Sequence, residues 1–272
     1  MHYVQGKVDV VTNVSKLFFQ QKFFAILNKT LEYKTKKINE DNMKYKFLLF
    51  DADNTVLDFD KAEENSLHNA FAKYGLPYDQ HVLTTYKRNN LYMWQQLELG
   101  LADKPTVRDK RFRMTFDELG LDVSDEQLME ISMCYEDGLH HGFAVIDHAE
   151  EVLQQLIDDG HTLILVSNGF LSVQIARMKG SGMGKYFPIR FISEQVGYSK
   201  PQKEFFDYAF DNIDGFEPSQ AIIIGDSLTS DIQGGVNAGI ATCWYNPNHA
   251  ENTRGVRVDY EISDLRQLYD IV

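Results

Sequence analysis

The 272-residue sequence has few cysteines, a shortage of positive charge and no long apolar run, and each of these excludes a class of protein. Cys134 and Cys243 are far apart and form no Cys-x-x-Cys pair, which excludes a disulfide framework. Lys and Arg number 27 against 40 Asp and Glu, so a body with a net charge of −13 lacks the basic face of a non-specific nucleic-acid binder. No run of about 18 apolar residues occurs, which excludes a membrane-spanning helix. We expect a cytoplasmic protein with neither a nucleic-acid polymer nor a membrane as partner.

Residues 1–42 differ from the rest of the chain. Lysine and glutamines interrupt their apolar stretch, and no small-residue cleavage site follows, so they fail the pattern of a signal peptide. Met43 stands immediately before the first strand-like run, so we expect residues 1–42 to be an extension outside the native fold. The alternative is a short amphipathic helix that docks on the body or on a partner, with Val14, Leu17, Phe18 and Phe24 on its apolar face.

Short apolar runs alternate with helical patterns in the rest of the chain. The runs are Phe47–Phe50, Ile189–Ile192, Ala221–Ile224, Ala241–Trp244 and Thr162–Val166. Short runs that end in polar residues are typical of parallel strands buried on both faces. The alternation predicts an α/β fold with a Rossmann-like, mostly parallel sheet, whose ligands bind beyond the carboxyl ends of the strands.

One long stretch, residues 60–140, contains helix signals and no convincing strand. Asp60 with Glu63 and Ser124 with Gln127 each have the spacing of a capping box. We therefore expect an all-helical domain inserted into the α/β core. The predicted division is an extension at 1–42, a core at 43–59 and 141–272, and the helical insert at 60–140.

Two carboxylates, Asp51 and Asp53, stand one residue apart directly after the first apolar run. This arrangement suits covalent phosphoryl transfer, in which one carboxylate attacks phosphorus and forms an aspartyl-phosphate. The other carboxylate protonates the leaving oxygen and later takes a proton from the attacking water. The residues alone do not assign these two roles.

Further polar residues follow later runs. Ser167 and Asn168 come directly after the run at 162–166, where a hydroxyl can hydrogen-bond a phosphate oxygen. Lys200 can neutralise both a carboxylate nucleophile and a phosphoryl group. Pro201 is favoured at the first position of a helix, which would place Lys200 at the entrance of the helix that follows.

The last polar cluster, Asp226 with Asp231, follows the run at 221–224. Mg²⁺ takes one or two carboxylates together with waters and phosphate oxygens. A divalent cation here would offset the repulsion between a carboxylate nucleophile and an anionic substrate. The paired carboxylates therefore predict a Mg²⁺ site.

With these four elements in this order, residues 43–272 resemble the haloacid dehalogenase-like hydrolase superfamily, mostly Mg²⁺-dependent phosphatases. The resemblance implies that Asp51 is the nucleophile, Asp53 the general acid/base and Lys200 a catalytic and phosphate-binding residue. It implies Mg²⁺ bound by Asp51, the Asp53 backbone carbonyl and Asp226, with Asp231 supporting the site from outside or through water. It also implies that the helical insert is a type-1 cap and that Ser167 and Asn168 bind phosphate. The dehalogenases of the superfamily lack an acid at the position of Asp53, so its presence favours phosphate esters.

A narrower resemblance, to the pyrimidine 5′-nucleotidases, rests on segments such as FDADNTVLDF, YKRNNLYMWQQLELG and GDSLTSDIQGG. It implies a nucleoside 5′-monophosphate as the small-molecule partner. Asn54 is a departure from this subgroup, because many of its members carry an Asp or a His at that position. Asn90 and Trp94 share one helical face and either contact the base or pack between helices of the insert.

Three alternatives to the nucleotidase function stay open: a phosphatase or phosphomutase for sugar phosphates, a haloacid dehalogenase, and a non-catalytic binding module.

Overall fold

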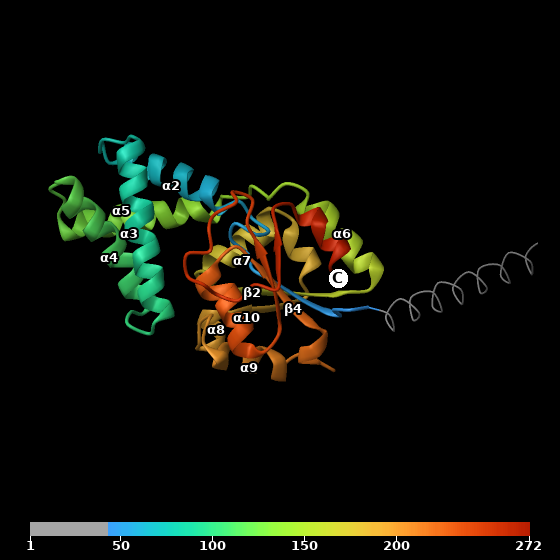
Figure 1. The fold of residues 1–272 in the computed structure, drawn as a ribbon. Coiled ribbons are helices and arrows are strands. Elements are labelled where there is room, and N and C mark those ends of the chain that lie inside the picture. Colours follow the sequence, from blue (N-terminus) through green and yellow to red (C-terminus); the bar gives the residue numbers. More distant parts are fainter. Residues whose placement is uncertain (1–42) are drawn as a thin grey trace, which may run out of the picture. The chain divides into compact units, whose positions relative to one another are not determined.

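The computed structural model describes residues 43–272, which contain one six-stranded parallel sheet and two groups of helices (Figure 1). Both hypotheses for residues 1–42 lie outside the described residues. The strands lie in the order β3-β2-β1-β4-β5-β6, and every neighbouring pair is parallel. Their bounds are β1 Phe47–Phe50, β2 Thr162–Ser167, β3 Ile189–Ile192, β4 Ala221–Gly225, β5 Ala241–Tyr245 and β6 Tyr260–Ile262. The predicted Rossmann-like α/β class and all five predicted strands are confirmed.

Alternate residues of the central strands enter two separate apolar clusters. Leu48 and Phe50 of β1 pack on one face of the sheet, whereas Phe47 and Leu49 pack on the other. Successive side chains of a strand point to opposite faces, so a strand covered on both sides must be apolar at every position. This requirement explains the continuous run FLLF and the burial of all its residues.

Helices that follow the strands cover both faces of the sheet (Figure 1). One cluster contains residues of α6 and α7, and the other contains residues of α9. The bounds of these helices are α6 Ala149–Asp159, α7 Leu171–Gly180, α8 Ser193–Val196, α9 Lys203–Asp211 and α10 Gln233–Ala238. Between residues 43 and 272, none of the helices combines the length and apolar character needed to span a membrane.

Four helices between β1 and α6 form a second group, here called the helical unit: α2 Phe59–Lys73, α3 Gln80–Glu98, α4 Lys104–Leu119 and α5 Asp125–His140. A polar side chain caps the first turn of each helix by accepting a backbone N–H. Ser124 and Gln127 form the predicted capping box of α5. The prediction for α2 was wrong, because Asp58 rather than Asp60 caps this helix and Asp60 lies inside it.

Two segments connect the helical unit to the sheet and hydrogen-bond to each other. The backbone N–H of Asp58 donates to Ala144 O over 3.0 Å, and that of Ile146 donates to Val56 O over 3.0 Å. Asn54 begins the outgoing segment with a positive φ of 56°, and its side-chain oxygen accepts the backbone N–H groups of Phe59 and Asp60. The helical unit is thereby attached at the carboxyl end of β1.

Candidate active site

Asp51 directly follows β1 at the point where the strand order of the sheet reverses. The chain adds β2 and β3 on one side of β1 and then β4, β5 and β6 on the other side. Open α/β sheets bind ligands at such a reversal. The backbone N–H of Asp51 donates to Ile224 O over 2.9 Å, so the residue is fixed by the sheet ladder. Its carboxylate is largely buried and lies 2.5 Å from the Lys200 ammonium.

Lys200 lies at the centre of the site and is only 1% exposed. Its Nζ donates to Asp51 Oδ1, to Asp231 Oδ1 over 2.6 Å and to Val166 O over 2.9 Å. Burial alone would lower the pKa of Lys200, but the adjacent carboxylates of Asp231 and Asp51 outweigh this and raise it. The lysine is therefore a permanent cation beside the Asp51 carboxylate.

The position of Lys200 is set by Asn168 rather than by a helix start. The Asn168 side chain accepts the Lys200 backbone N–H over 2.9 Å and donates to its carbonyl over 2.8 Å. The expectation that Pro201 opens a helix was wrong, because α9 begins at Lys203 and Gln202 precedes it. Both polar atoms of the Asn168 side chain are therefore engaged with the Lys200 backbone.

Ser167 is the last residue of β2, and its side chain lines the same cavity as Asp51. Its Oγ accepts the backbone N–H of Gly169 over 3.0 Å. This bond leaves the hydroxyl hydrogen of Ser167 free to donate to another acceptor.

Asp226 and Asp231 come from the segment after β4, where a π-helical turn, Leu228–Ile232, carries Asp231. Gly225 permits this turn, because a Cβ there would lie 2.3 Å from the Asp231 carboxyl group. The backbone of Asp226 is held by Trp244, whose indole N–H donates to its carbonyl over 2.8 Å. Single-turn π segments of this kind are frequent at functional sites.

The carboxylates of Asp51, Asp226 and Asp231 each place an oxygen within 4.8 Å of the others. Burial, with the charges of neighbouring carboxylates, raises the pKa of Asp51 to about 7 and that of Asp226 well above its usual range. Three carboxylates therefore face one lysine, and two negative charges are left without a partner. An all-oxygen set with this excess charge fits a divalent cation such as Mg²⁺.

Asp53 lines the same cavity as these three carboxylates, but its side chain is held by residues of a different element. One carboxylate oxygen accepts from Arg177 Nη1, and the other accepts from Gln174 Nε2 over 2.6 Å. Both donors belong to α7, and Arg177 is fully buried. Neither residue was predicted, because nothing in the spacing of two polar residues on one helix indicates a partner more than a hundred positions earlier.

A cavity of about 360 Å³ extends from Asp51 and Asp226 toward the helical unit. Asn90 and Trp94, predicted as substrate residues on one face of a helix, both lie on α3 and both line this cavity. Asn90 donates to Glu63 over 2.7 Å, and Trp94 packs edge-on against Phe170 with ring centroids 5.7 Å apart. Trp94 therefore packs against a neighbouring ring and also lines the cavity, and its contact with a base stays a prediction.

Three further cavity residues were not predicted as site residues: Glu63, Glu98 and Arg111. Burial raises the pKa of Glu63 and that of Glu98 to about 7. Arg111 is buried on α4. In the sequence it is one of four helical arginines, with Arg88, Arg108 and Arg113, that could include a substrate contact, although most arginines on helices are solvated. The sequence offered no signal for Glu63 and Glu98, because Glu63 becomes buried only where helices of the insert meet and Glu98 becomes partly buried only where α3 approaches the turn that carries Asp231.

Comparison with known proteins places the chain in a family. Residues 48–245 match the family described as haloacid dehalogenase-like hydrolases. The chain belongs to this family. These hydrolases include the HAD-hydrolase YfnB of Bacillus subtilis, which is 37% identical over 84% of this chain and 96% of YfnB. The magnesium-bound crystal structure of YfnB superposes with a TM-score of 0.78, at 36% identity over 84% of this chain and 98% of that one.

Two relatives are named for the same activity, that of a pyrimidine 5′-nucleotidase. The pyrimidine 5′-nucleotidase PynA of Streptococcus pneumoniae is 37% identical over 84% of this chain and 95% of its own length. The pyrimidine 5′-nucleotidase YjjG of Escherichia coli is 28% identical over 85% of this chain and 99% of its own length. The resemblance to this subgroup of the hydrolases is confirmed, and so is the expectation of a hydrolase.

Proposed function

We propose that this hydrolase removes phosphate from nucleoside 5′-monophosphates, with pyrimidine nucleotides preferred. The observation that carries the proposal is the position of Asp51, which joins two regions of one cavity. On one side lie Lys200, Ser167 and the acidic pair of Asp226 and Asp231, which suit a phosphoryl group. On the other side lie aromatic and amide side chains of the helical unit, which suit a flat polar ring.

Two steps follow from this arrangement. In the first, a carboxylate oxygen of Asp51 attacks phosphorus, the bond from phosphorus to the ester oxygen breaks, and Asp53 gives that oxygen a proton. In the second, water attacks the phosphorus of the aspartyl-phosphate, Asp53 takes a proton from that water, and the bond from phosphorus to the Asp51 oxygen breaks. The Asp51 carboxylate is regenerated, and inorganic phosphate leaves. Splitting the displacement in this way replaces one difficult step by two easier ones.

The other residues act on charge and position. Lys200 lowers the repulsion between the Asp51 carboxylate and the anionic substrate, and Ser167 donates to a phosphoryl oxygen. Mg²⁺, held by Asp51, Asp226 and the Asp53 backbone carbonyl with support from Asp231, would supply positive charge to the phosphoryl oxygens. The excess of buried carboxylates over cations supports this assignment.

The helical unit acts as the cap in this proposal, with residues 60–140 as the cap and residues 43–59 and 141–272 as the core. This assignment is supported by α3 and α4, which provide the cavity wall opposite Asp51. A cap in this position would exclude water from the site and select the leaving group.

The test is phosphate release with Mg²⁺ from a panel of nucleoside monophosphates and sugar phosphates, with Asp51→Asn as the blank. Preference for UMP, dUMP or dTMP supports the proposal. Preference for sugar phosphates would keep the chemistry and contradict the substrate class. Release of little phosphate together with a need for a bisphosphate activator would indicate a mutase.

A further inference from the structure

Arg111 has hydrogen-bonding capacity that the described protein does not use. Its side chain lies in α4, is 1% exposed and contributes to the cavity wall. Nη1 donates to Asn90 Oδ1 over 3.3 Å. Within residues 43–272, its Nε and Nη2 atoms are buried and contact no acceptor. Two donors of a charged group thus remain unpaired at the cavity.

The surroundings of Arg111 make these unpaired donors costly. Aromatic rings lie around the guanidinium, whose central carbon is 5.0 Å from the ring centre of Tyr135, 5.6 Å from that of Phe112 and 5.7 Å from that of Phe170. A buried polar group without a partner loses its hydration and gains nothing in return. The cavity is the direction from which an acceptor can be supplied.

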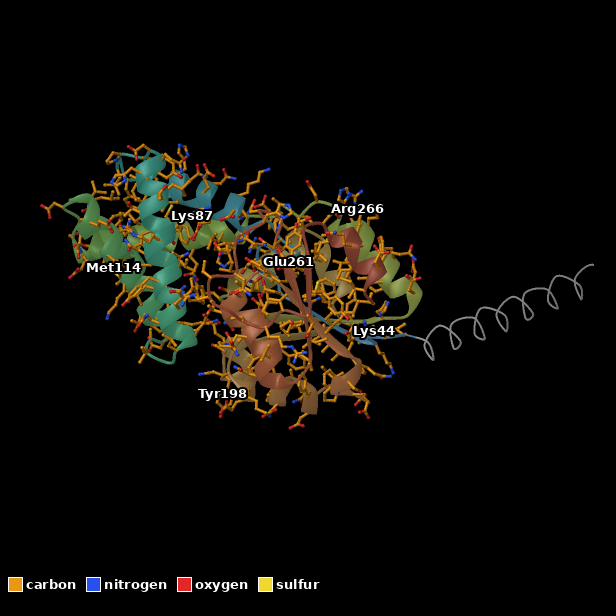
Figure 2. The ribbon with its side chains drawn as sticks, in the orientation of Figure 1. Lys44, Lys87, Met114, Tyr198, Glu261 and Arg266 are labelled. Atoms are coloured by element: carbon orange, nitrogen blue, oxygen red, sulfur yellow. The ribbon has the colours of Figure 1, made fainter. Side chains whose placement is uncertain are left out.

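The local charge indicates what kind of acceptor fits. Glu63 accepts no hydrogen bond from Arg111 directly, but its carboxylate accepts from Asn90, whose side-chain oxygen accepts from Arg111. Lys87 lies where α3 approaches α2, and its ammonium is 2.5 Å from Asp60 and 3.9 Å from Glu63 (Figure 2). When Glu63 is ionised, the two cations Arg111 and Lys87 and the two carboxylates Asp60 and Glu63 balance at this end of the cavity. A second anionic group would find no excess positive charge, whereas a neutral oxygen would satisfy the guanidinium without adding charge.

The shape of the wall restricts the acceptor further. Trp94 and Phe170 present aromatic surface next to Arg111, and Leu91 adds an aliphatic surface. Aromatic walls favour a flat ring, because ring stacking and edge contacts add to the gain from burial. The combined features fit a flat, neutral ring that carries a carbonyl oxygen.

We infer that Arg111 binds a carbonyl oxygen of the substrate base and thereby determines specificity. The inference rests on the proposed nucleotidase function and names the group that distinguishes its substrates. Uracil, thymine and cytosine each carry a ring carbonyl, guanine carries one as well, and adenine carries none, so this contact separates the carbonyl-bearing bases from adenine. Asn90 positions the guanidinium through its bond to Nη1, and Glu63 in turn holds Asn90.

The experiment compares UMP with ribose 5-phosphate, which has the same phosphoryl group and sugar but no base. Arg111→Met and Arg111→Lys are assayed for kcat/KM on both substrates, beside the wild type. Arg113→Met is the matched control, because Arg113 lies on the same helix but contacts Asp125 and the Val123 carbonyl instead of the cavity. AMP is a second substrate without the carbonyl.

Loss of two charge-assisted hydrogen bonds should lower kcat/KM for UMP about 10²-fold in Arg111→Met, and the values for ribose 5-phosphate and AMP should stay within about threefold. Arg111→Lys should lose part of the UMP activity, and it replaces Arg111→Met in the comparison if the latter does not fold. Arg113→Met should keep the wild-type ratio of UMP to ribose 5-phosphate.

If the Arg111 variants lost kcat/KM equally on all substrates, or lost none on UMP, the inference about Arg111 would be overturned. The proposed nucleotidase function would be unaffected by either result. Failure of the wild type itself to prefer UMP to ribose 5-phosphate would overturn the proposed function, and the inference with it.

Discussion

Removal of the Asp53 carboxylate should slow the enzyme in a way that depends on the leaving group. An alkoxide leaving group such as the 5′ oxygen of a nucleoside needs a proton as it departs, whereas p-nitrophenolate is stable as an anion. General acid catalysis contributes roughly 10²–10⁴-fold. We therefore expect Asp53→Asn to lower kcat/KM on UMP by about this factor and to lower kcat/KM on p-nitrophenyl phosphate much less.

The structure also sets the cost of the substitution in stability. The two oxygens of Asp53 accept from two different donors, Arg177 and Gln174. An asparagine has one oxygen and one NH₂ group, so one of these donors must face another donor and lose its partner. A buried unsatisfied group costs roughly 1–3 kcal/mol, compared with the roughly 5–15 kcal/mol by which folded domains are stable. The variant should therefore stay folded at 25 °C, with a lower unfolding midpoint.

The assay is steady-state kinetics of the wild type and Asp53→Asn on both substrates, with thermal unfolding measured on the same preparations. The ratio of the two kcat/KM losses is the decisive quantity, because kcat/KM reports the first step, whereas kcat also contains the breakdown of the aspartyl-phosphate, in which Asp53 acts for both substrates. Equal losses on UMP and p-nitrophenyl phosphate would refute the role of Asp53 as a proton donor to the leaving group. They would indicate instead that the substitution disturbs the position of Asp51.

The remaining predictions concern the buried charges. Asp51→Asn should abolish phosphate release, and retained turnover would contradict the covalent mechanism. The same substitution should not lower the unfolding midpoint in metal-free buffer, because the pKa of about 7 shows that burial disfavours the ionised form of Asp51. Asp226→Ala should raise the Mg²⁺ concentration for half-maximal activity, and an unchanged value in a Mg²⁺ titration would argue against its role as a ligand. Lys200→Met should cost about 3–5 kcal/mol in a urea titration, since it leaves buried carboxylates unpaired. Because the pKa of Glu63 is raised from 4.5 to about 7, the folded state holds a proton that the unfolded state releases, so stability should fall as pH rises through this interval. The loss is on the order of 3 kcal/mol, and Glu63→Gln should remove most of it from stability curves measured between pH 4.5 and 7.

The sheet could be predicted from the sequence because its signal is local. Strands buried on both faces need apolar residues at every position, so Phe47–Phe50 and Ala221–Ile224 are recognisable without knowledge of their neighbours. β6, with only Tyr260–Ile262 and an exposed glutamate in the middle, has no such run and was missed. Its place at the edge of the sheet depends on pairing with β5, which no pattern of three residues can indicate.

The residues at the strand ends could also be predicted, because topology alone brings the ends of parallel strands together. Asp51 follows β1, Ser167 ends β2 and Asp226 follows β4. These three strands are neighbours in the sheet. Arg177 and Arg111 could not be predicted in this way. Each is buried by helices that meet only after the helical unit has packed against the sheet, and a lone arginine on a helix is usually solvated.

Arg177 shows why the missed residues matter to the site as a whole. Its Nε donates to Gly142 O over 2.9 Å, on the segment by which the chain returns from the helical unit, while Nη1 contacts Asp53 on the outgoing segment. The guanidinium also lies 5.3 Å from the ring of Phe59, the first residue of α2. One buried side chain of the sheet domain therefore contacts both connections to the helical unit and the proposed general acid. The position of Asp53 is consequently determined jointly by the sheet and by the segments that carry the helical unit. A site assembled from strand ends alone would hold the nucleophile and the carboxylates of the proposed metal site, but it would leave the proton donor without an anchor.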